Sequence, residues 1–378
     1  MRQSRRGQVD PFIVMDVMEA AARAEAQGRH IIHMEVGQPS TPAPTAARKS
    51  LARALDQPLG YTVALGLPRL RQGIAALYRR WYGVDLDPAR VVVTPGSSGA
   101  FLLTFSALFD TGDRVAIGAP GYPSYRQIMR AMSIDPVTIP TRLENRFQPV
   151  PDELPADVQG LMLASPGNPS GTMLSLDALR GLIGAAHDQG IAVISDEIYH
   201  GLSYGERCHS ALEISDEVFI INSFSKYFSM TGWRVGWMVV PESHLRTVER
   251  LAQNMFICPP HASQIAALAA LDAEDEAQVN LATYAENRRL MIEGLPRAGF
   301  DRIAPPDGAF YIYADVSALT DDSRAFAAEI LDKAGLAVTP GLDFDAERGA
   351  QTMRFSYARS TADIREGLAR LERFMAAR

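Results

Sequence analysis

The residues best suited to chemistry lie close together between positions 223 and 234. Ser223, Ser225 and Lys226 are followed by Arg234, eight residues after the lysine. A lysine amine condenses with an aldehyde to form a Schiff base, and hydroxyl and guanidinium groups bind phosphate. These groups could therefore hold a phosphorylated aldehyde covalently at one end and ionically at the other, as pyridoxal phosphate requires. The alternative is an exposed turn with a solvated amine, because short motifs often match by chance.

A loop rich in serine and glycine, residues 94–100, leads from an expected strand into an expected helix. Ser97 and Ser98 would place backbone N–H groups and hydroxyls at a helix N-terminus, which suits a phosphate dianion. An ordinary strand-to-helix turn is the alternative. The chain contains neither a GxGxxG nor a GxxxxGK(S/T) motif, which argues against dinucleotides and nucleoside triphosphates.

Three further loops carry groups that could contact a planar ring. Tyr122 could stack on such a ring, although an aromatic beside proline more often serves packing. Asn168 lies among turn-forming residues, which would aim its amide as a hydrogen-bond donor. Asp196 follows the most apolar expected strand, where a carboxylate needs a cationic partner such as a protonated pyridine nitrogen. A metal site formed by Asp196 and His200 would lack a third ligand nearby in sequence.

A single arginine, Arg354, interrupts the apolar stretch at 353–357. A buried guanidinium needs an anion that it can bind with two hydrogen bonds, and the α-carboxylate of a substrate would serve. A salt bridge to an aspartate or glutamate of the chain is the alternative.

Apolar runs separated by helical patterns predict the scaffold that positions these loops. Such runs are typical of parallel strands buried on both faces, so we expect an α/β fold with a mixed, mostly parallel sheet. Ligands of such sheets bind at the carboxyl ends of the strands, where the polar loops lie. The predicted strands are residues 91–93, 115–117, 161–163, 191–194, 218–221 and 235–240, with helices at 100–109, 122–131 and 176–189.

The two ends of the chain have a different pattern and predict a smaller α+β domain. Residues 1–44 and 286–378 would form this domain, and residues 45–285 the large domain. At the start, Asp10 and Pro11 are expected to begin a helix that runs to about Gly28. The other predicted elements are a strand at 31–36, helices at 45–55, 68–82, 276–297 and 323–334, strands at 309–313 and 353–357, and a final helix from 361.

Composition excludes several classes of protein. With 47% hydrophobic and 21% charged residues among 378, the chain matches an ordinary globular protein. The net charge is −7 and no basic cluster extends beyond Arg2, Arg5 and Arg6, which argues against a nucleic-acid partner. No uncharged run approaches the ~20 residues of a membrane helix. Cys208 and Cys258 lack CxxC spacing, so a cytoplasmic location is expected.

Taken in order, these loops resemble those of the class I/II aminotransferases, which have the type I fold of pyridoxal-phosphate enzymes and include aspartate aminotransferase. The resemblance extends over nearly the whole chain, from residues 36–39 to Arg354, and includes Tyr61, Thr62 and residues 305–311. It implies pyridoxal 5′-phosphate as cofactor and a transaminase that moves an amino group from an L-α-amino acid to a 2-oxo acid by a ping-pong Schiff-base mechanism.

The resemblance also implies a role for each candidate residue. Lys226 would form the Schiff base, Asp196 would pair with the pyridine nitrogen, and Tyr199 would complete the catalytic set. Asn168 and Tyr199 would hydrogen-bond the 3-oxygen of the ring, while Tyr122 stacks on its face. The phosphate would be bound by Ser97, Ser98, Ser223, Ser225 and Arg234. The substrate would be bound by Gly37, Asn168 and Arg354.

In this family the tyrosine that matches Tyr61 reaches the cofactor phosphate of the neighbouring subunit. The resemblance therefore implies a homodimer with shared active sites. Two other functions stay open on the same residues. One is a C–S β-lyase, because it begins from the same carbanion. The other is the ligand-sensing domain of a transcription regulator, although the fold is expected to begin by about residue 10, which leaves no room for a DNA-binding domain.

The preferred amino acid is the least determined feature. Relatives that act on dicarboxylic acids use a second cation, and none can be matched here; Arg29, His33 or a residue of the partner subunit could serve. Phe12, Ile13 and Phe310 favour an apolar substrate side chain instead.

Overall fold

The computed structural model describes residues 1–378, and a seven-stranded sheet forms its centre. The strand order is β2-β8-β7-β6-β5-β3-β4, and only β8 runs antiparallel to its neighbours. The predicted mixed, mostly parallel α/β sheet is therefore confirmed. The strands are β2 (Val91–Thr94), β3 (Arg114–Ala119), β4 (Asp135–Pro140), β5 (Gly160–Ala164), β6 (Ala192–Asp196), β7 (Val218–Ser223) and β8 (Gly236–Val239).

Strand β4 was not predicted, because it lies at the edge of the sheet. Only Ile139 is buried in it, and Pro136 and Pro140 interrupt the apolar pattern. Proline is tolerated at an edge, where one side of the strand has no hydrogen-bonding neighbour. The sequence of an edge strand therefore lacks the continuous apolar run of the central strands.

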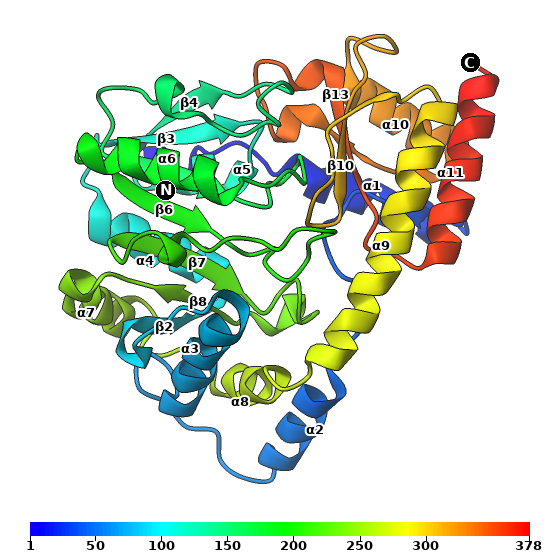
Figure 1. Ribbon diagram of the computed structural model, residues 1–378. Coiled ribbons are helices and arrows are strands. Elements are labelled where there is room, and N and C mark those ends of the chain that lie inside the picture. The colour runs from blue at the N-terminus through cyan, green and yellow to red at the C-terminus, as the bar shows by residue number, and fades with distance from the viewer.

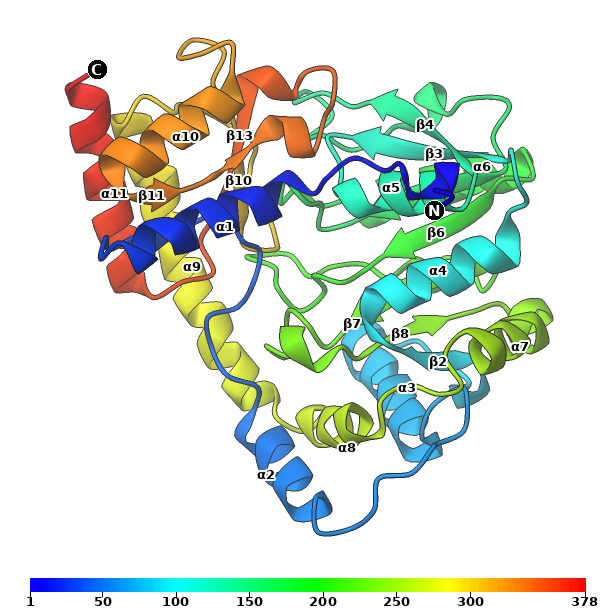
Figure 2. The same cartoon turned by 180° about the vertical axis from the view of Figure 1, so that it is seen from behind.

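Helices cover both faces of the sheet, because successive strand residues point to opposite sides. Ile220 packs with the core on the side of α3 and α6 (Figure 1), whereas Ile221 packs with α4, α5 and α7 on the other side (Figure 2). These helices are α3 (Pro68–Tyr82), α4 (Gly96–Leu108), α5 (Pro123–Ala131), α6 (Leu176–Asp188) and α7 (Leu245–Met255).

A second, four-stranded sheet of order β12-β13-β10-β9 lies beside the first, with α9, α10 and α11 packed around it. Helix α1 joins this group, as Figure 2 shows, and strand β1 pairs with β11. Division into domains at residues 44 and 285 stays a prediction. The elements are α1 (Ile13–Ala26), β1 (Ile32–His33), α2 (Thr45–Ala54), α8 (His261–Ala270), α9 (Glu274–Arg297), β9 (Arg302–Ile303), β10 (Tyr311–Asp315), α10 (Ser323–Ala334), β11 (Leu336–Ala337), β12 (Thr339–Pro340), β13 (Thr352–Ser356) and α11 (Thr361–Ala376). None of these helices combines the length and apolar character needed to cross a lipid bilayer.

The start of α1 differs from the prediction. Asp10 does not cap the helix; its carboxylate accepts a hydrogen bond from Arg130 instead. The helix begins at Ile13, and the backbone N–H groups of Ile13 and Val14 donate to the carboxylate of Asp343, at 2.9 and 3.2 Å. A distant carboxylate thus satisfies donors that a local cap usually serves. A cap from so far along the chain cannot be read from the local sequence.

Candidate active site

One cavity, of about 570 Å³, gathers most of the predicted site residues. It lies where the carboxyl ends of β2, β3, β5, β6 and β7 meet the N-terminal segment and the second sheet. Of the residues predicted to be catalytic or to bind cofactor or substrate, Ser223 and Tyr61 do not line it. Those that do are Gly37, Ser97, Ser98, Tyr122, Asn168, Asp196, Tyr199, Ser225, Lys226, Arg234 and Arg354.

Lys226 follows β7, and its Nζ donates a hydrogen bond of 2.6 Å to the backbone oxygen of Gly37. Burial and the nearby cations Arg354 and Arg234 lower the pKa of Lys226 to about 8, against the opposing effect of Asp196. The amine is therefore far more nucleophilic near neutral pH than an exposed lysine. The glycine at 37 is required by space, since a Cβ there would stand 1.7 Å from Oη of Tyr311.

Asp196 ends β6 and is only 4% exposed. Its Oδ1 accepts the N–H of Ile198 at 3.0 Å, and its Oδ2 accepts the hydroxyl of Tyr125. Burial raises the pKa of Asp196 to about 6, and the Tyr125 bond opposes that rise. No lysine or arginine forms an ion pair with this carboxylate, so a cationic ring nitrogen would supply the missing partner.

Tyr125 was not predicted as a site residue, although the sequence held a signal for it. Tyr122 and Tyr125 both lie in the segment expected to be helical, three residues apart, and such residues share one face of a helix. In the structure their rings meet edge to face, with centroids 5.3 Å apart, and both line the cavity.

The phosphate end of the predicted site is a helix terminus. No side chain caps the first turn of α4, which begins at Gly96 and leaves its N–H groups free for an anion. Arg234 lies against this turn: a Cβ on Gly96, whose φ is +73°, would stand 2.4 Å from Nη2 of the arginine. Glycine thus makes room for the guanidinium, and the two groups together form a cradle for a dianion.

Ser223 and Tyr61 are placed differently from the other predicted phosphate ligands. The hydroxyl of Ser223 is buried behind the cavity, 2.7 Å from Oγ of Ser225 and 3.1 Å from the backbone oxygen of Val235. It supports Ser225 and does not line the cavity, and its direct contact with a phosphate stays a prediction. Tyr61 is 84% exposed on the outside of this chain.

Arg354 lies in β13 and is only 3% exposed, yet it pairs with no carboxylate. The predicted alternative of a salt bridge is therefore wrong. Nη1 donates to Oδ1 of Asn168 at 2.8 Å, and Nε has no partner. The guanidinium lies between the rings of Tyr311 and Phe344, 4.4 and 4.7 Å from their centroids. This buried cation needs an anion, and its bond to Asn168 leaves the amide Nδ2 free to donate.

Tyr311 lines the cavity, where Phe310 was expected. Tyr311 is the first residue of β10, whereas Phe310 lies in the turn that precedes the strand. Phe310 is fully buried behind it, whereas Oη of Tyr311 lies 2.8 Å from Oη of Tyr199. Ile13 does not line the cavity either. Phe12 does line it, together with Val14, Met15 and Val36.

Neither Arg29 nor His33 lines the cavity, so of the three cations considered for a distal carboxylate only a residue of the partner subunit stays open. Arg29 donates to the backbone oxygen of Leu331, at 2.9 Å, near the end of α10. His33 lies between Glu35 and Glu25, at 2.8 and 3.0 Å from their carboxylates. These pairings raise the pKa of His33, with the bond to Glu35 as the main cause.

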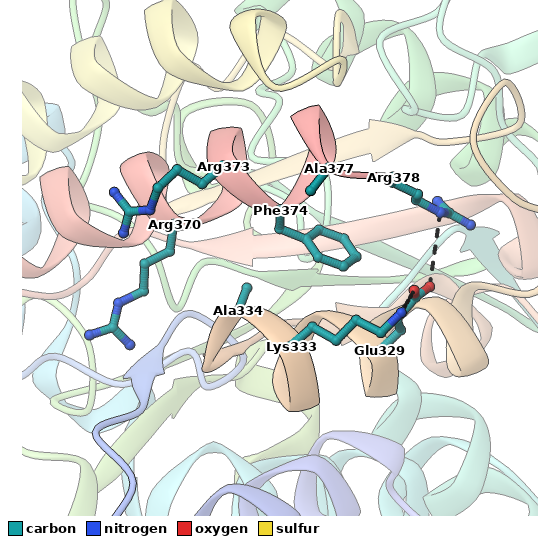
Figure 3. A pocket seen from close by; sticks show the side chains of 8 residues that line it. All are labelled: Glu329, Lys333, Ala334, Arg370, Arg373, Phe374, Ala377 and Arg378. Carbon is teal, nitrogen blue, oxygen red and sulfur yellow. Dashed lines mark hydrogen bonds and ion pairs between the residues drawn. The ribbon is translucent and has the colours of Figure 1, made fainter.

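A second cavity, of about 450 Å³ between α10 and α11, is rich in cations but offers a poorer site (Figure 3). Lys333 is paired with Glu329 at 2.8 Å, and Arg370 with Glu366 at 2.8 Å. Both cations already have carboxylate partners, and Lys333 is mostly exposed. Glu329 is the only acid among the lining residues and is already paired with Lys333, so no carboxylate is left to face a cationic ring.

Comparisons with known proteins agree with this geometry. The profile of the family "Aminotransferase class I and II" matches residues 29–371. A valine–pyruvate aminotransferase of Mycobacterium tuberculosis is 46% identical over 98% of this chain and 97% of that protein. The crystal structure of an aminotransferase from Mycobacterium tuberculosis is 45% identical, with TM-score 0.98 over 100% of both chains. The structure of Thermus thermophilus aspartate aminotransferase with maleate is 30% identical, with TM-score 0.92 over 99% of this chain and 100% of that one.

Proposed function

Because this chain belongs to the class I and II aminotransferase family and is a transaminase, we propose that it uses pyridoxal 5′-phosphate, held by Lys226, to transaminate an L-α-amino acid with an apolar side chain. The observation that carries the proposal is the meeting of three different partners in one cavity. They are a nucleophilic amine, a buried carboxylate without a cation, and an uncapped helix N-terminus beside an arginine. No observation favours the C–S β-lyase.

The residues present fit the cofactor at each of its ends. The first turn of α4 and Arg234 would bind the phosphate, and Asp196 would face the ring nitrogen. Nδ2 of Asn168 and the hydroxyl of Tyr199 would donate to the ring oxygen, because the other polar contacts of the two side chains go to Arg354 and Tyr311. Tyr122 would cover one face of the ring.

When bound, the cofactor supplies an aldehyde that condenses with amines and a cationic ring that accepts electrons from the substrate Cα. Arg354 binds the substrate carboxylate and so orients the Cα–H bond toward Lys226. The amine of Lys226, with its pKa lowered to about 8, would serve as the base for the Cα proton once the substrate amine has replaced it on the aldehyde carbon, and it would return the proton to that carbon. Asp196 would stay ionised opposite the ring cation, which would lower its pKa from the value of about 6 set by burial.

The apolar substrate class follows from the charges that line the cavity. Its cations are Lys226, Arg234 and Arg354, and each is assigned to the aldehyde, the phosphate or the α-carboxylate. None is left for a second carboxylate. The N-terminal segment contributes one wall, and its side chains are mostly apolar: Phe12, Val14, Met15 and Val36 line the cavity there, with Gly37 and one uncharged polar side chain, that of Gln38. The similar Mycobacterium tuberculosis protein is named for valine and pyruvate, and we infer a branched aliphatic donor and a small oxo-acid acceptor here.

A half-reaction screen tests this proposal. Single amino acids are added to the yellow cofactor-loaded enzyme, and the loss of yellow absorbance is followed without an oxo acid. Valine is expected to bleach the enzyme much faster than aspartate, since a charged side chain against the apolar wall would lose its hydration without a partner. Faster bleaching by aspartate would overturn the substrate class. Release of pyruvate and ammonia from a sulfur amino acid would favour the lyase, and no response to any amino acid would favour a ligand-sensing role.

Covalent capture of the cofactor by the apoprotein is expected to accelerate with rising pH, with a midpoint near 8. Only the neutral amine attacks an aldehyde, and burial, Arg354 and Arg234 lower the pKa of Lys226 to about 8. Arg354→Gln removes one of these cations and should move the midpoint upward. The growth of yellow absorbance after rapid mixing measures the rate. A wild-type midpoint near that of an exposed lysine, about 10.4, would contradict the assignment.

We also infer that the protein is a homodimer. Two neighbouring loops expose large apolar side chains, and they are held together by a bond from the N–H of Thr62 to Sγ of Cys258, at 3.4 Å. An apolar surface of this kind is typical of an interface between copies, and Tyr61 lies within it. Analytical ultracentrifugation that finds a single chain at micromolar concentration would contradict this. The exposed residues are Leu55, Leu59, Tyr61, Val63, Met255 and Ile257.

A further inference from the structure

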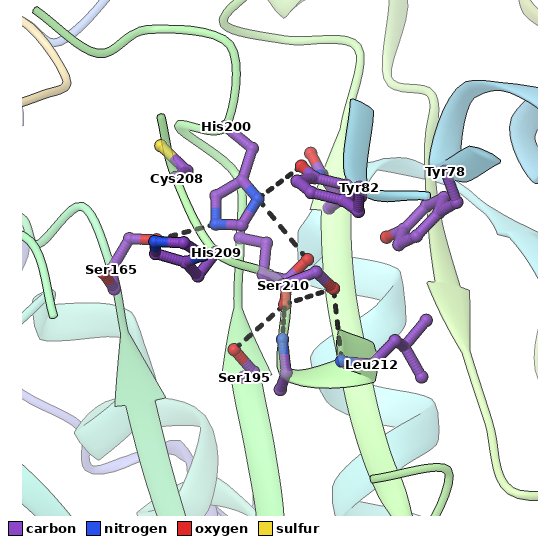
Figure 4. Close-up of polar contacts among 12 residues, drawn as sticks. Tyr78, Tyr82, Ser165, Ser195, His200, Cys208, His209, Ser210 and Leu212 are labelled. Carbon is purple, nitrogen blue, oxygen red and sulfur yellow. Dashed lines mark hydrogen bonds and ion pairs between the residues drawn. The ribbon is translucent and has the colours of Figure 1, made fainter. Parts of the chain in front are cut away.

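A buried imidazole behind the cavity links two of the loops that carry site residues (Figure 4). Nε2 of His200 lies 2.9 Å from the backbone oxygen of Ser165, and Nδ1 lies 2.6 Å from the hydroxyl of Tyr82, at the end of α3. His200 is 2% exposed and does not line the cavity. Three segments that are distant in sequence therefore meet on one ring.

The direction of both hydrogen bonds follows from their partners. A carbonyl oxygen only accepts, so Nε2 of His200 carries the hydrogen and Nδ1 accepts the hydroxyl of Tyr82. The ring is then neutral, in agreement with burial, which lowers the pKa of His200 to about 3. The charged and titratable groups around the ring are Glu197, whose Oε2 lies 3.6 Å from Nδ1, with Tyr82, Arg207, His209 and Glu213.

The segment that carries His200 is itself firmly anchored. Oε1 of Glu197 accepts hydrogen bonds from Oγ of Ser210 at 3.0 Å and from the N–H of Ala211 at 2.9 Å. Burial raises the pKa of Glu197 to about 8. Because these bonds hold the turn in place, the hydrogen bond from His200 fixes the position of the backbone oxygen of Ser165 that accepts it.

The hydrogen bond from His200 goes to the start of the loop that carries Asn168. Ser165 lies three residues before Asn168, and His200 directly follows Tyr199. Resting on the proposed function, in which Asn168 and Tyr199 donate to the same ring oxygen of the cofactor, we propose that His200, oriented by Tyr82, is a positioning residue. It sets the distance between those two donors and so the strength of both hydrogen bonds.

The consequence is measurable in the cofactor itself. Two donors stabilise the anionic ring oxygen, and weaker donation favours the protonated form of the linkage between the cofactor and Lys226. The pH at which the bound cofactor changes its visible absorbance therefore depends on the two donors. A histidine that served packing alone would not change that pH.

Four variants of the cofactor-loaded enzyme test the proposal. His200→Phe keeps a ring and removes both hydrogen bonds, and we expect the absorbance midpoint to rise by about one pH unit. Turnover should fall about tenfold, with the KM for the amino acid changed far less. Tyr82→Phe removes one oxygen and should give a smaller shift in the same direction. His200→Gln can donate and accept through its amide and should restore the midpoint, while His209→Gln, beside the network but not bonded to Ser165, should leave it unchanged.

Thermal unfolding identifies any variant that fails to fold, and Tyr82→Phe, which only loses an oxygen, keeps the test available in that case. A wild-type midpoint in both His200→Phe and Tyr82→Phe, with activity lowered only as far as the folded fraction, would overturn the proposal. A wild-type protein that never turns yellow with pyridoxal phosphate would instead overturn the proposed function.

Discussion

Lys226→Ala is expected to abolish repeated turnover, with kcat lowered by at least about 10⁴-fold, the upper range for a positioned general base. The alanine variant can neither hold the aldehyde nor move the Cα proton, because no other lysine lines the cavity. The cofactor should still bind non-covalently, since the first turn of α4 and Arg234 remain. Mass spectrometry after borohydride reduction should then find the cofactor attached to the wild type and absent from the variant.

Two checks separate this loss from unfolding. The pKa of Lys226 is lower in the folded apoprotein, about 8, than in the unfolded chain, so below pH 8 the charged amine favours unfolding. Loss of the charged amine in Lys226→Ala should therefore not lower the free energy of unfolding of the apoprotein at neutral pH. Lys333→Ala, which removes an exposed lysine paired with Glu329, should keep wild-type activity. Normal multiple turnover by Lys226→Ala would refute the role of this lysine.

Asp196→Asn is expected to lower kcat by about 10²–10³-fold while the cofactor stays bound, the range found when one preorganised electrostatic group is removed. The amide keeps the shape of the side chain but cannot hold a proton on the ring nitrogen, so the ring accepts electrons less well. Stopped-flow bleaching by a good amino-acid substrate measures the step directly. A rate equal to that of the wild type would contradict the assignment of Asp196.

Tyr125→Phe provides a graded comparison, because it removes only one hydrogen bond to Asp196. That bond lowers the pKa of the carboxyl group, so its loss raises the pKa further and should reduce kcat less than Asp196→Asn does.

A stability measurement provides the control for Asp196→Asn. Because burial raises the pKa of Asp196 to about 6 in the folded apoprotein, the buried charge destabilises the fold above pH 6. Asp196→Asn should therefore unfold at a higher temperature than the wild-type apoprotein at pH 7, which excludes misfolding as the cause of lost activity.

Much of the fold could be predicted where its signals are local. Helices α3 and α10 begin and end at the predicted residues. Each is followed by a glycine with positive φ, Gly83 or Gly335, which is a local signal for a helix end. The central strands were recognised by their apolar runs. The start of α1 and strand β4 were not, because a carboxylate from Asp343 replaces a local cap and an edge strand needs little apolar sequence.

The candidate site shows the same division. The loops of the site could be identified from the sequence, because each follows an apolar strand and carries a polar or charged side chain that would be costly to bury without a binding partner. A prediction failed where the direction of a single side chain was decisive: Phe310 was expected at the cavity, and Tyr311 lines it instead. The contact of Ser223 with the phosphate stays a prediction, and in the structure its hydroxyl bonds to Val235 and Ser225.

The sequence by itself therefore determined the strand order in the chain, the loops at the strand ends and the chemical groups on those loops. The reason is that apolar periodicity and turn residues act over a few neighbours and leave their mark in the local sequence. Only the tertiary structure decided which groups meet. Arg354 bonds to Asn168 across 186 residues, and His200 joins the ends of two loops. Such contacts depend on packing between distant segments, which no local pattern encodes.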